Sequence, residues 1–524
     1  LNSLDKEEGL AEVRGFLAGS MRGRQMLVRF FCLGPIDSVF SISGVQLTDS
    51  AYVGHSEDLL YRPGYGQFER LGDSEDFFRV LHSAGRLENH VSADVDKRRI
   101  YVNLEDDIVY SVNTQYAGNT VGFKKLSLRL AICKADREGW LAEHMLVMGV
   151  RGPGGRVTYF TGAFPSGCGK TSTAMLPGET IVGDDIAYFR AIDGEARAVN
   201  VECGIFGIIR DVNTEDDPII YDVLNRPGEV IFSNVLLADG RPYWEGMGCE
   251  PPGEGVNYSG PWHAGKQDAG GNEVAVSHWN ARYTVTLKDL SNLDKHWDDP
   301  AGVPFRGIFY GGRDSDTCVP VQQSFDWAHG VVTMGAGLES ETTAATIGQE
   351  GVRKWQPMSN LDFVSLPLGR YIGNNLEFGQ GLAQPPAIFA VNYFLRGAGR
   401  EYLNAMNDKH AWVKWAELRV HAEVGAIRTP TGLIPLYEDL VRLFRDVLGK
   451  DYARLDYVEQ FQTRGPENLA KLDRIEDIFR TRVADTPPVV FEVLSGQRRR
   501  LEEALETCGD YVSPLHFVQT GQVE

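Results

Sequence analysis

The stretch FPSGCGKTS, at residues 164–172, constrains the fold of this chain more than any other segment. The segment VTYFTGAF (157–164) has the aromatic and β-branched composition of a strand, and a helix is expected to begin near Lys170. A strand, a tight turn and a helix N-terminus aim several backbone N–H groups at an anion, so the pattern predicts a phosphate cradle. It departs from the usual phosphate-loop formula because Phe164 occupies the place of the leading glycine.

Side chains within this loop have both functional and structural interpretations. Lys170 would reach the outer phosphates, and the Thr171 hydroxyl would face a magnesium ion bound to them. A plain helix start is the alternative, because Gly-Lys-Thr alone is a weak signal. Near a helix N-terminus the thiolate form of Cys168 would be favoured, which predicts a reactive thiol; a small filler residue is the alternative.

A candidate metal site lies in the segments around the loop. ETIVGDDIAYF (179–189) predicts an apolar strand that ends in Asp184 and Asp185, where a metal-holding pair belongs. His144 lies in the apolar run GWLAEHMLVMGV (139–150), and with Asp185 it would supply nitrogen and oxygen ligands for a metal such as manganese. The alternatives are a turn rich in Gly and Asp, and a core histidine with satisfied hydrogen bonds.

Two adjacent lysines, Lys124 and Lys125, precede this histidine. They could form an ordinary solvated charge pair. If one of them instead coordinated the metal, it would have to be neutral, which burial beside a cation can enforce.

The composition indicates a globular enzyme. With 524 residues, of which 43% are hydrophobic, the chain is long enough for two or three domains. A net charge of −20, from 52 basic and 72 acidic side chains, argues against nonspecific binding to nucleic acid or an anionic membrane. The 7 cysteines form no CxxC pair, which is typical of reduced thiols in a cytoplasmic protein. No apolar run is long enough to span a bilayer, and the charged stretch LNSLDKEEGLAEV, without an initiator Met, indicates a start inside a longer gene product rather than a signal peptide.

Hydrophobic periodicity predicts the remaining elements. We expect an amphipathic helix at 6–19 and a buried strand at 26–33. A hairpin is expected at 98–104 with 107–113, and the C-terminus is expected to be helical from about residue 436 onward. The run 139–150 is compatible with either helix or strand. The Gly- and Pro-rich segment PPGEGVNYSGPWHAGKQDAGGN, between residues 250 and 275, predicts a surface loop.

A longer series of segments carries a resemblance to a known family. In chain order they are GSMRGRQMLV, QLTDSAYVGHSEDLLYR, YAGNTVGFKK, EGWLAEHML, FPSGCGKTS, VGDDIA, VNVECGIFGI, IFSNV, YWEGM, HWNARYTV, GVPFRGIFYGGR, WAHGVV, ESETTAA and FAVNYF. Their order and spacing resemble those of GTP-dependent phosphoenolpyruvate carboxykinases over nearly the whole chain. That family enters its phosphate loop from Ala-Phe-Pro-Ser, which accounts for Phe164.

The resemblance implies an α/β enzyme with mixed sheets and an active-site cleft between two domains. Residues 1–145 would form an N-terminal substrate-binding domain. Residues 146–524 would form a nucleotide-binding domain with the phosphate loop at 164–172, a mobile lid near 337–350 and a helical C-terminus. The family's arginine that clamps the substrate carboxylate would lie upstream of Leu1.

The resemblance also implies an activity and a set of site residues. The enzyme would reversibly convert oxaloacetate to phosphoenolpyruvate and CO2 with GTP, acting on small molecules as a monomer. Manganese would be held by Lys125, His144 and Asp185. Substrate contacts are expected from Tyr116, the Gly118 backbone, Ser166, Asn280 and Arg282. Contacts with the phosphates, the nucleotide and their magnesium ion are expected from Gly167, Cys168, Gly169, Lys170, Thr171, Ser172, Asp184, Arg313, Phe394 and Tyr402. Catalytic roles are expected for Lys124, Cys168, Lys170, Arg282 and Arg313.

Two departures from the family concern the backbone and the lid. Ala117 replaces a family glycine in the substrate segment. Glu339 stands where the family usually has arginine at the lid entrance, so closure of ESETTAA (339–345) is expected to be triggered differently.

The guanine pocket departs further. Tyr393, Phe394 and Tyr402 supply aromatic rings, but Asn407 and His410 replace the last aromatic residue and the asparagine that bonds the base. The sequence therefore leaves two alternatives to GTP chemistry: the same reaction with pyrophosphate, phosphate or another nucleotide, and a non-catalytic nucleotide-binding regulatory subunit. An unrelated P-loop kinase is a further alternative.

Overall fold

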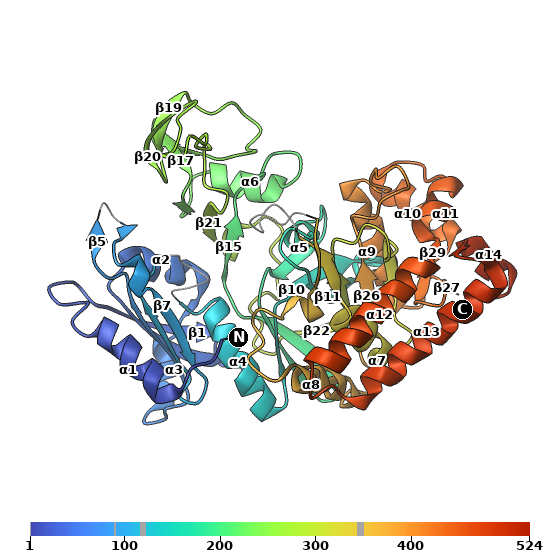
Figure 1. Ribbon diagram of the computed structural model, residues 1–524, viewed down its shortest axis with the longest axis horizontal. Helices are drawn as coiled ribbons and strands as arrows, with labels where there is room; N and C mark the ends of the chain where they lie inside the picture. Colours follow the sequence, from blue (N-terminus) through green and yellow to red (C-terminus); the bar gives the residue numbers. More distant parts are fainter. Residues whose placement is uncertain (1, 89–90, 116–121, 343–350) are drawn as a thin grey trace. The chain divides into compact units, whose positions relative to one another are not determined.

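The computed structural model describes residues 2–88, 91–115, 122–342 and 351–524 (Figure 1). The chain divides into two compact units, each built from two stretches of sequence. The first unit comprises Leu1–Leu130 and Asn200–Pro300, and the second comprises Ala131–Val199 and Ala301–Glu524. The expected mixed α/β fold is confirmed; the division at residue 145 remains a prediction.

A six-stranded mixed sheet forms the centre of the first unit. Its order is β3 (Arg62–Pro63), β1 (Leu27–Leu33), β2 (Ile42–Thr48), β4 (Phe78–Ser83), β8 (Ile108–Val112) and β7 (Arg99–Asn103). Its helices are α1 (Lys6–Leu17), α2 (Ala51–Leu60) and α3 (Tyr65–Leu71). Val13 of α1 is buried against Tyr110 and Val112 of β8, so the helix covers the sheet as its amphipathic pattern predicts. The predicted strand at 26–33 and hairpin at 98–113 are also confirmed.

Two smaller sheets complete the first unit. The first has the order β15 (Gly204–Ile208), β21 (Arg282–Thr286) and β16 (Ile231–Ser233). The second has the order β18 (Arg241–Tyr243), β17 (Leu236–Ala238), β19 (Glu254–Asn257) and β20 (Gly260–His263). The helix α6 (Pro218–Asn225) lies between β15 and β16 in the chain.

The prediction of a loop between residues 250 and 275 was wrong, because β19 and β20 form a hairpin there. Its tight turn is closed by Asn257, whose Oδ1 accepts from the Ser259 N–H at 2.9 Å. Gly260 has a φ of 84°, a conformation that favours glycine. The composition therefore reflects the turns of a small sheet, whose Trp262 is buried against Leu236.

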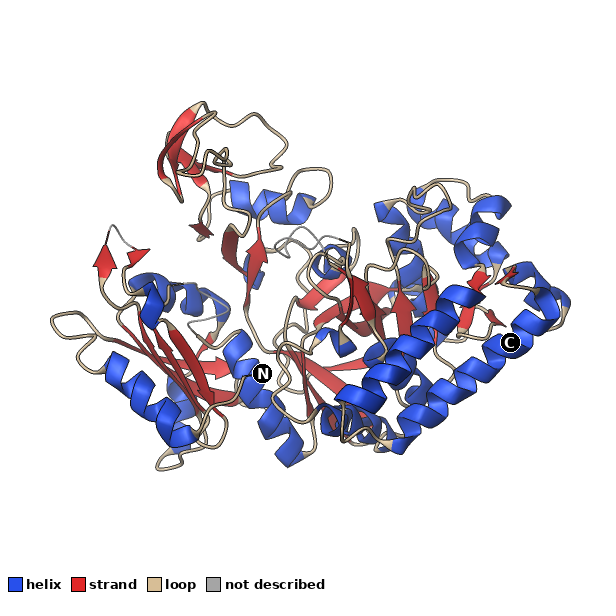
Figure 2. Cartoon of the chain, viewed as in Figure 1, coloured by secondary structure: helices blue, strands red, loops and turns tan. Residues whose placement is uncertain are grey.

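An eleven-stranded mixed sheet forms the centre of the second unit (Figure 2). Its main path is β12 (Thr180–Gly183), β10 (Leu146–Arg151), β11 (Val157–Ala163), β22 (Val303–Gly311), β26 (Ala387–Val391), β23 (Val321–Gln323), β28 (Leu433–Pro435) and β27 (Ala426–Arg428). The branch strands are β9 (Leu141–Glu143), β13 (Ala187–Ile192) and β14 (Glu195–Asn200). The ambiguous run 139–150 is thus two strands, β9 and β10, with His144 between them.

Helices surround this sheet and form the C-terminus. They are α5 (Lys170–Ala174), α7 (Trp327–His329), a π-helix (Gly330–Ala336), α8 (Leu368–Gln380), α9 (Lys409–Val420), α10 (Tyr437–Leu448), α11 (Arg454–Phe461), α12 (Gly465–Arg482), α13 (Pro488–Cys508) and α14 (Pro514–Gln519). α4 (Lys125–Glu138) connects the two units along the chain. The predicted helical C-terminus is confirmed. Among the described residues, none of the helices combines the length and hydropathy needed to cross a membrane.

Candidate active site

The phosphate loop has the predicted strand–turn–helix geometry. β11 ends at Ala163 and α5 begins at Lys170. Gly167 and Gly169 between them have φ angles of 71° and 103°, which favour glycine. Gly169 also has no room for a side chain, since an added Cβ would lie 2.9 Å from Cδ2 of Tyr393.

Phe164 anchors the entrance to this loop. Its ring is 1% exposed and stacks on Tyr393 with centroids 6.1 Å apart. The ring also covers Gly311, where an added Cβ would clash with Cε1 of Phe164. The loop is therefore held at this end by aromatic packing in place of a glycine turn.

Three predicted site residues converge beside the loop. His144 Nε2 lies 2.9 Å from Asp185 Oδ1 and 2.9 Å from Lys170 Nζ. Lys170 Nζ also contacts Asp185 Oδ1. His144 comes from the β9–β10 connection and Asp185 follows β12, which pairs with β10, so neighbouring strands bring the two residues to the start of α5.

The hydrogen bonds of His144 define which ring nitrogen faces this cluster. The Ser359 carbonyl lies 2.9 Å from Nδ1 and can only accept, so Nδ1 carries a proton. The Lys170 ammonium can only donate, so Nε2 offers a lone pair. Nε2 and the Asp185 carboxylate are therefore two acceptors that meet at a shared cation, a donor set that fits a metal ion.

The predicted third ligand, Lys125, belongs to the first unit, and its role remains a prediction. In the part of the chain that the structure describes, no three His, Cys, Asp or Glu residues group as metal ligands. Asp184 and Asp185 are both buried, with exposed fractions of 8% and 7%. The expected pair of carboxylates is thus present at the end of β12, but the contacts given above involve Asp185.

Lys124 and Lys125 are buried, so the alternative of a solvated charge pair is wrong. Lys124 Nζ donates to Glu202 Oε1 at 2.5 Å, and both side chains are at most 3% exposed. Glu57 accepts from the Phe123 N–H at 3.1 Å, and burial raises the pKa of Glu57 to about 8. Lys124 therefore lies in a dehydrated acidic environment of the first unit, beside Glu202, and Lys125 is also buried.

The first unit also pairs two predicted substrate contacts. Arg282 donates from Nε and Nη2 to Asn280 Oδ1, at 3.0 and 2.8 Å. The guanidinium lies over the Phe206 ring, 5.3 Å from its centroid. Tyr116 and Gly118, the other predicted substrate contacts in this unit, lie outside the described residues.

Arg313 connects the phosphate loop with the predicted nucleobase residues. Its Nη2 donates to the Gly167 carbonyl at 3.2 Å, and its Nη1 donates to the Tyr402 hydroxyl at 3.3 Å. Its guanidinium lies over Phe394, 3.8 Å from the ring centroid. Phe394 and Tyr402 pack edge to face, with centroids 6.2 Å apart.

His410 and Asn407, which replace the family's guanine contacts, have different structural settings. His410 Nε2 lies 2.9 Å from Glu179 Oε1, so a buried carboxylate engages its ring. Asn407 lies in a 3₁₀ turn, Met406–Asp408.

Sequence analysis missed Lys409, which lies between these positions. It is 5% exposed and donates from Nζ to Ser172 Oγ of the phosphate loop at 2.7 Å. Nζ also lies 5.8 Å from the Tyr393 ring centroid. The signal that could have revealed it is the apolar surround of α9, which buries Trp412 and Trp415 completely and leaves little solvent for a lysine in the same helix.

The expectation of a reactive Cys168 was wrong. Its side chain is 1% exposed, and burial raises the pKa of the thiol, against the lowering expected at a helix N-terminus. Sγ lies 3.2 Å from Ser340 Oγ. The structure favours the alternative of a small filler residue, so Cys168 is not assigned a catalytic role. Ser166, in contrast, is exposed, and Thr171 is half-buried.

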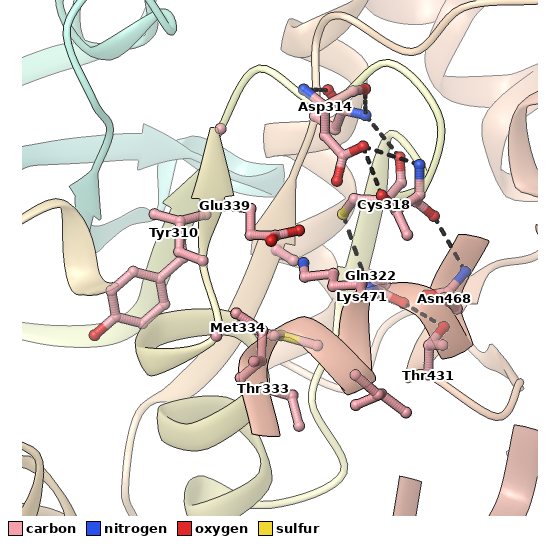
Figure 3. A pocket seen from close by; sticks show the side chains of 18 of the residues that line it. Tyr310, Asp314, Cys318, Gln322, Thr333, Met334, Glu339, Thr431, Asn468 and Lys471 are labelled. Atoms are coloured by element: carbon pink, nitrogen blue, oxygen red, sulfur yellow. Dashed lines mark hydrogen bonds between the residues drawn. The ribbon is translucent and has the colours of Figure 1, made fainter. Parts of the chain in front are cut away.

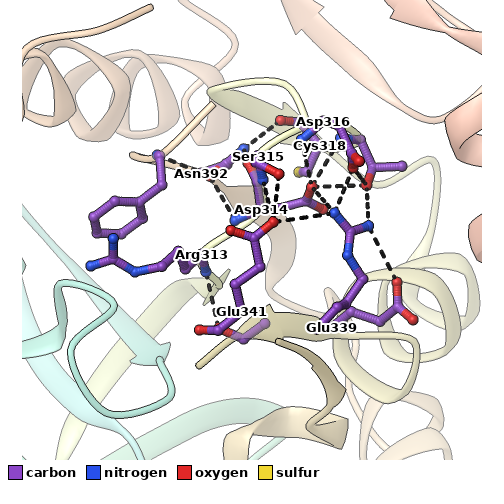
Figure 4. A network of polar contacts seen from close by, with 12 residues as sticks. Arg313, Asp314, Ser315, Asp316, Cys318, Glu339, Glu341 and Asn392 are labelled. Carbon is purple, nitrogen blue, oxygen red and sulfur yellow. Dashed lines mark hydrogen bonds and ion pairs between the residues drawn. The ribbon is translucent and has the colours of Figure 1, made fainter. Parts of the chain in front are cut away.

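Glu339 belongs to a network of charges (Figure 4). It lies in β24 (Glu339–Glu341), which pairs with β25 (Arg353–Trp355). Its buried carboxylate accepts from Nε and Nη2 of Arg474 at 2.9 and 2.7 Å, and Oε2 lies 3.7 Å from Arg353 Nη1. The acid that replaces the family arginine therefore has two arginine partners. Residues 343–350 of the predicted lid lie outside the described residues.

Glu339 is one of the residues that line a cavity of about 50 Å³ (Figure 3). Asp314, Gln322 and Lys471 are among its polar lining, and its volume suits a few water molecules. Burial alone would raise the pKa of Asp314, but the charges of Lys471 and Arg353 lower it. The cavity therefore adjoins the same charge network and has room for water.

Comparison with known proteins places these features in a family. The model of the phosphoenolpyruvate carboxykinase C-terminal P-loop domain matches residues 140–500, and that of the phosphoenolpyruvate carboxykinase N-terminal domain matches residues 1–136. A phosphoenolpyruvate carboxykinase [GTP] of Pyrococcus abyssi is 58% identical over 520 residues, covering 99% of this chain and 84% of the relative. Proteins of the same name are 58% identical in Thermococcus kodakarensis, covering 98% of this chain and 83% of the relative, and 47% identical in Saccharolobus solfataricus, covering 99% and 83%.

Proposed function

The chain belongs to the GTP-dependent phosphoenolpyruvate carboxykinase family, and from this premise we propose how its residues carry out the reaction. The reaction is the reversible conversion of oxaloacetate to phosphoenolpyruvate and CO2, with GTP as the phosphoryl donor. The observation that carries the proposed mechanism is the convergence of His144, Asp185 and Lys170 at the start of the phosphate loop.

We propose that His144 and Asp185 hold a manganese ion, with Lys125 as the third protein ligand. The lone pair on Nε2 and the carboxylate oxygen are suitable donors for a divalent transition metal. When bound, the ion supplies positive charge that stabilises developing negative charge during the reaction. The Lys170 ammonium, which contacts both residues, is then free to bind a phosphate oxygen.

The chain's own cations stabilise the remaining charge. Loss of CO2 leaves an enolate, and we assign Lys124 and Arg282 to its stabilisation, with Asn280 orienting the Arg282 guanidinium. Lys170 and Arg313 balance the charge on the transferred phosphoryl group, because Arg313 already reaches the loop at Gly167. The Thr171 hydroxyl and Asp184 serve the magnesium ion that accompanies the phosphates.

The relatives named for GTP favour that donor over pyrophosphate, and no finding favours a regulatory subunit. We propose that the nucleobase packs on Phe394 and Tyr402, and that Lys409 serves the nucleotide through its position beside Ser172. We further propose a monomeric, cytoplasmic enzyme that acts on small molecules.

The test compares Asp185→Asn with Asp477→Asn, an equal change of charge at an exposed position of α12. Carboxylation of phosphoenolpyruvate is measured with manganese and bicarbonate, coupled to malate dehydrogenase, with GDP, ADP, IDP or phosphate as the acceptor. Asp185→Asn is expected to abolish turnover and weaken Mn²⁺ binding, because it removes the anionic ligand. Full turnover in Asp185→Asn would refute the metal assignment, and activity with phosphate but not GDP would refute the proposed donor.

A further inference from the structure

A strained turn lies beside the candidate metal ligand His144. Met358 and Ser359 are consecutive residues with φ angles of 52° and 53°, in the left-handed region that non-glycine residues rarely adopt. Both are buried, with exposed fractions of 0% and 6%. Surrounding contacts must hold such a conformation, and buried strain of this kind concentrates at functional sites.

The turn presents one carbonyl group to the histidine. Ser359 O lies 2.9 Å from His144 Nδ1, which fixes the proton on Nδ1 and leaves the lone pair on Nε2. The Phe363 ring packs edge to face on the imidazole, with centroids 5.1 Å apart, and restricts its rotation. The hydrogen bond and the ring contact together aim Nε2 toward Asp185, 2.9 Å away.

A buried polar cluster holds the turn in place. Asn360, which follows the two strained residues, donates from Nδ2 to the Tyr371 hydroxyl at 2.9 Å and to Glu143 Oε2 at 3.2 Å. The Tyr371 hydroxyl donates to the same oxygen of Glu143. The other oxygen, Oε1, accepts from Asn375 Nδ2 at 3.3 Å. The cluster thus joins the turn to α8, which carries Tyr371 and Asn375, and to β9, which ends at Glu143.

Glu143 makes the cluster specific for this histidine. It is fully buried and directly precedes His144, so the group that anchors the turn also fixes the backbone from which the imidazole projects. Both ends of the Ser359–His144 hydrogen bond are therefore tied to one carboxylate. Core packing alone has no need for this arrangement, because an apolar cluster would avoid the cost of burying polar groups.

We propose that Asn360, held by Glu143 and Tyr371, is a positioning residue for metal binding. It stabilises the left-handed turn, and the turn holds His144 in the tautomer that donates a lone pair from Nε2. The inference rests on the proposed function, in which His144 is a metal ligand. Partners of this kind that orient a ligating histidine typically contribute roughly 10–100-fold to metal affinity.

The test measures Mn²⁺ affinity of the full chain by titration calorimetry, independently of turnover. Asn360→Ala is expected to weaken Mn²⁺ binding roughly 10–100-fold while GDP affinity without metal stays within about twofold. Asn375→Ala is the matched control, because it removes an amide from the same carboxylate without touching the turn. Unchanged Mn²⁺ affinity in Asn360→Ala, or an equal loss in Asn375→Ala, would overturn the proposal.

Two further variants separate positioning from general destabilisation. Ser359→Gly added to Asn360→Ala is expected to restore part of the Mn²⁺ affinity, because glycine adopts the left-handed conformation without strain. No restoration would count against the turn as the route. If Asn360→Ala does not fold, Tyr371→Phe is the milder substitution, since it removes one hydroxyl from the cluster, and it too must weaken Mn²⁺ binding.

His144→Gln distinguishes this proposal from the metal assignment on which it rests. If that variant retains full Mn²⁺ affinity, the proposed metal site itself is wrong. If it loses affinity while Asn360→Ala and Tyr371→Phe do not, the metal assignment stands and the positioning role is refuted.

Discussion

Substituting Glu339 by arginine, the residue that the family usually has at this position, is expected to destabilise this protein. The carboxylate is 5% exposed and accepts two hydrogen bonds from the Arg474 guanidinium. Arg353 approaches the same carboxylate at 3.7 Å. An arginine at residue 339 would place a third guanidinium where the structure supplies partners for an anion.

The magnitude follows from the burial of each partner. Glu339→Gln keeps one acceptor oxygen, so it forfeits one charge-assisted hydrogen bond, nominally about 1.5–3 kcal/mol, and leaves the other guanidinium N–H facing an amide donor, which costs about 1–3 kcal/mol more. Arg474 is 42% exposed, so water compensates for much of this and about 2 kcal/mol remains. Glu339→Arg adds repulsion from two cations and is expected to cost about 4 kcal/mol, in the range measured for broken buried pairs.

The assay is thermal unfolding of the full chain, with Arg474→Glu in the Glu339→Arg background as the rescue. At roughly 2 °C per kcal/mol for a large domain, Glu339→Gln should lower the melting temperature by about 4 °C and Glu339→Arg by about 8 °C. The charge-swapped double variant should recover part of the loss, because it restores an oppositely charged pair. A Glu339→Arg variant that melts at or above the unsubstituted protein would refute the reasoning.

Three further predictions concern other buried groups. Burial, with the charge of Arg500, lowers the pKa of His329 to about 4, below its unfolded value of about 6.5. The unfolded state therefore binds more protons than the folded state between these pH values. The free energy of unfolding should fall as the pH drops from about 6.5 to 4, by at most about 3 kcal/mol. His329→Gln should remove this part of the pH dependence of the urea midpoint. Lys409→Met should weaken GDP binding about 10-fold or more in calorimetry, because it removes a charged hydrogen-bond donor. An unchanged GDP affinity would argue against a role of Lys409 in nucleotide binding. Cys168 should react with a thiol reagent more slowly than the exposed Cys249, as peptide mapping of the labelled protein would reveal.

Sequence patterns predicted the strands and helices whose hydrophobic periodicity matches the surface that they bury in the fold. The helix at Lys6–Leu17 has an apolar stripe that meets β8, and the phosphate loop combines glycines with a following helix. The hairpin of β19 and β20 was missed because each strand has only four residues, Glu254–Asn257 and Gly260–His263. The glycine and proline residues in and around these short strands gave the stronger signal, which indicated a loop. Glycine and proline mark chain reversals, and in a small sheet the reversals outnumber the cues for the strands between them.

The positions of candidate site residues were predictable where one motif fixes both the residue type and its place in the fold, and their roles remain predictions. Asp185 and Lys170 are examples, since the end of a strand and the start of a helix determine their positions. The reactivity of Cys168 was not predictable, because it depends on Ser340 and on burial by segments distant in the sequence. A dipole argument at a helix N-terminus assumes solvent access, and desolvation by tertiary packing reverses the direction of the pKa shift.

The nucleotide end of the site illustrates why aligned positions and spatial roles can separate. His410 occupies the position of a family base contact, yet its ring is engaged by Glu179, 2.9 Å away. Lys409, one residue earlier, projects on a different side of the same helix start, because successive helical residues are about 100° apart, and its ammonium reaches Ser172 of the phosphate loop. A loss of guanine contacts by alignment therefore does not by itself imply a loss of nucleotide binding. If Phe394 and Tyr402 hold the nucleobase and Lys409 serves the nucleotide, as we propose, substitutions of these three residues should change the selectivity for the nucleotide.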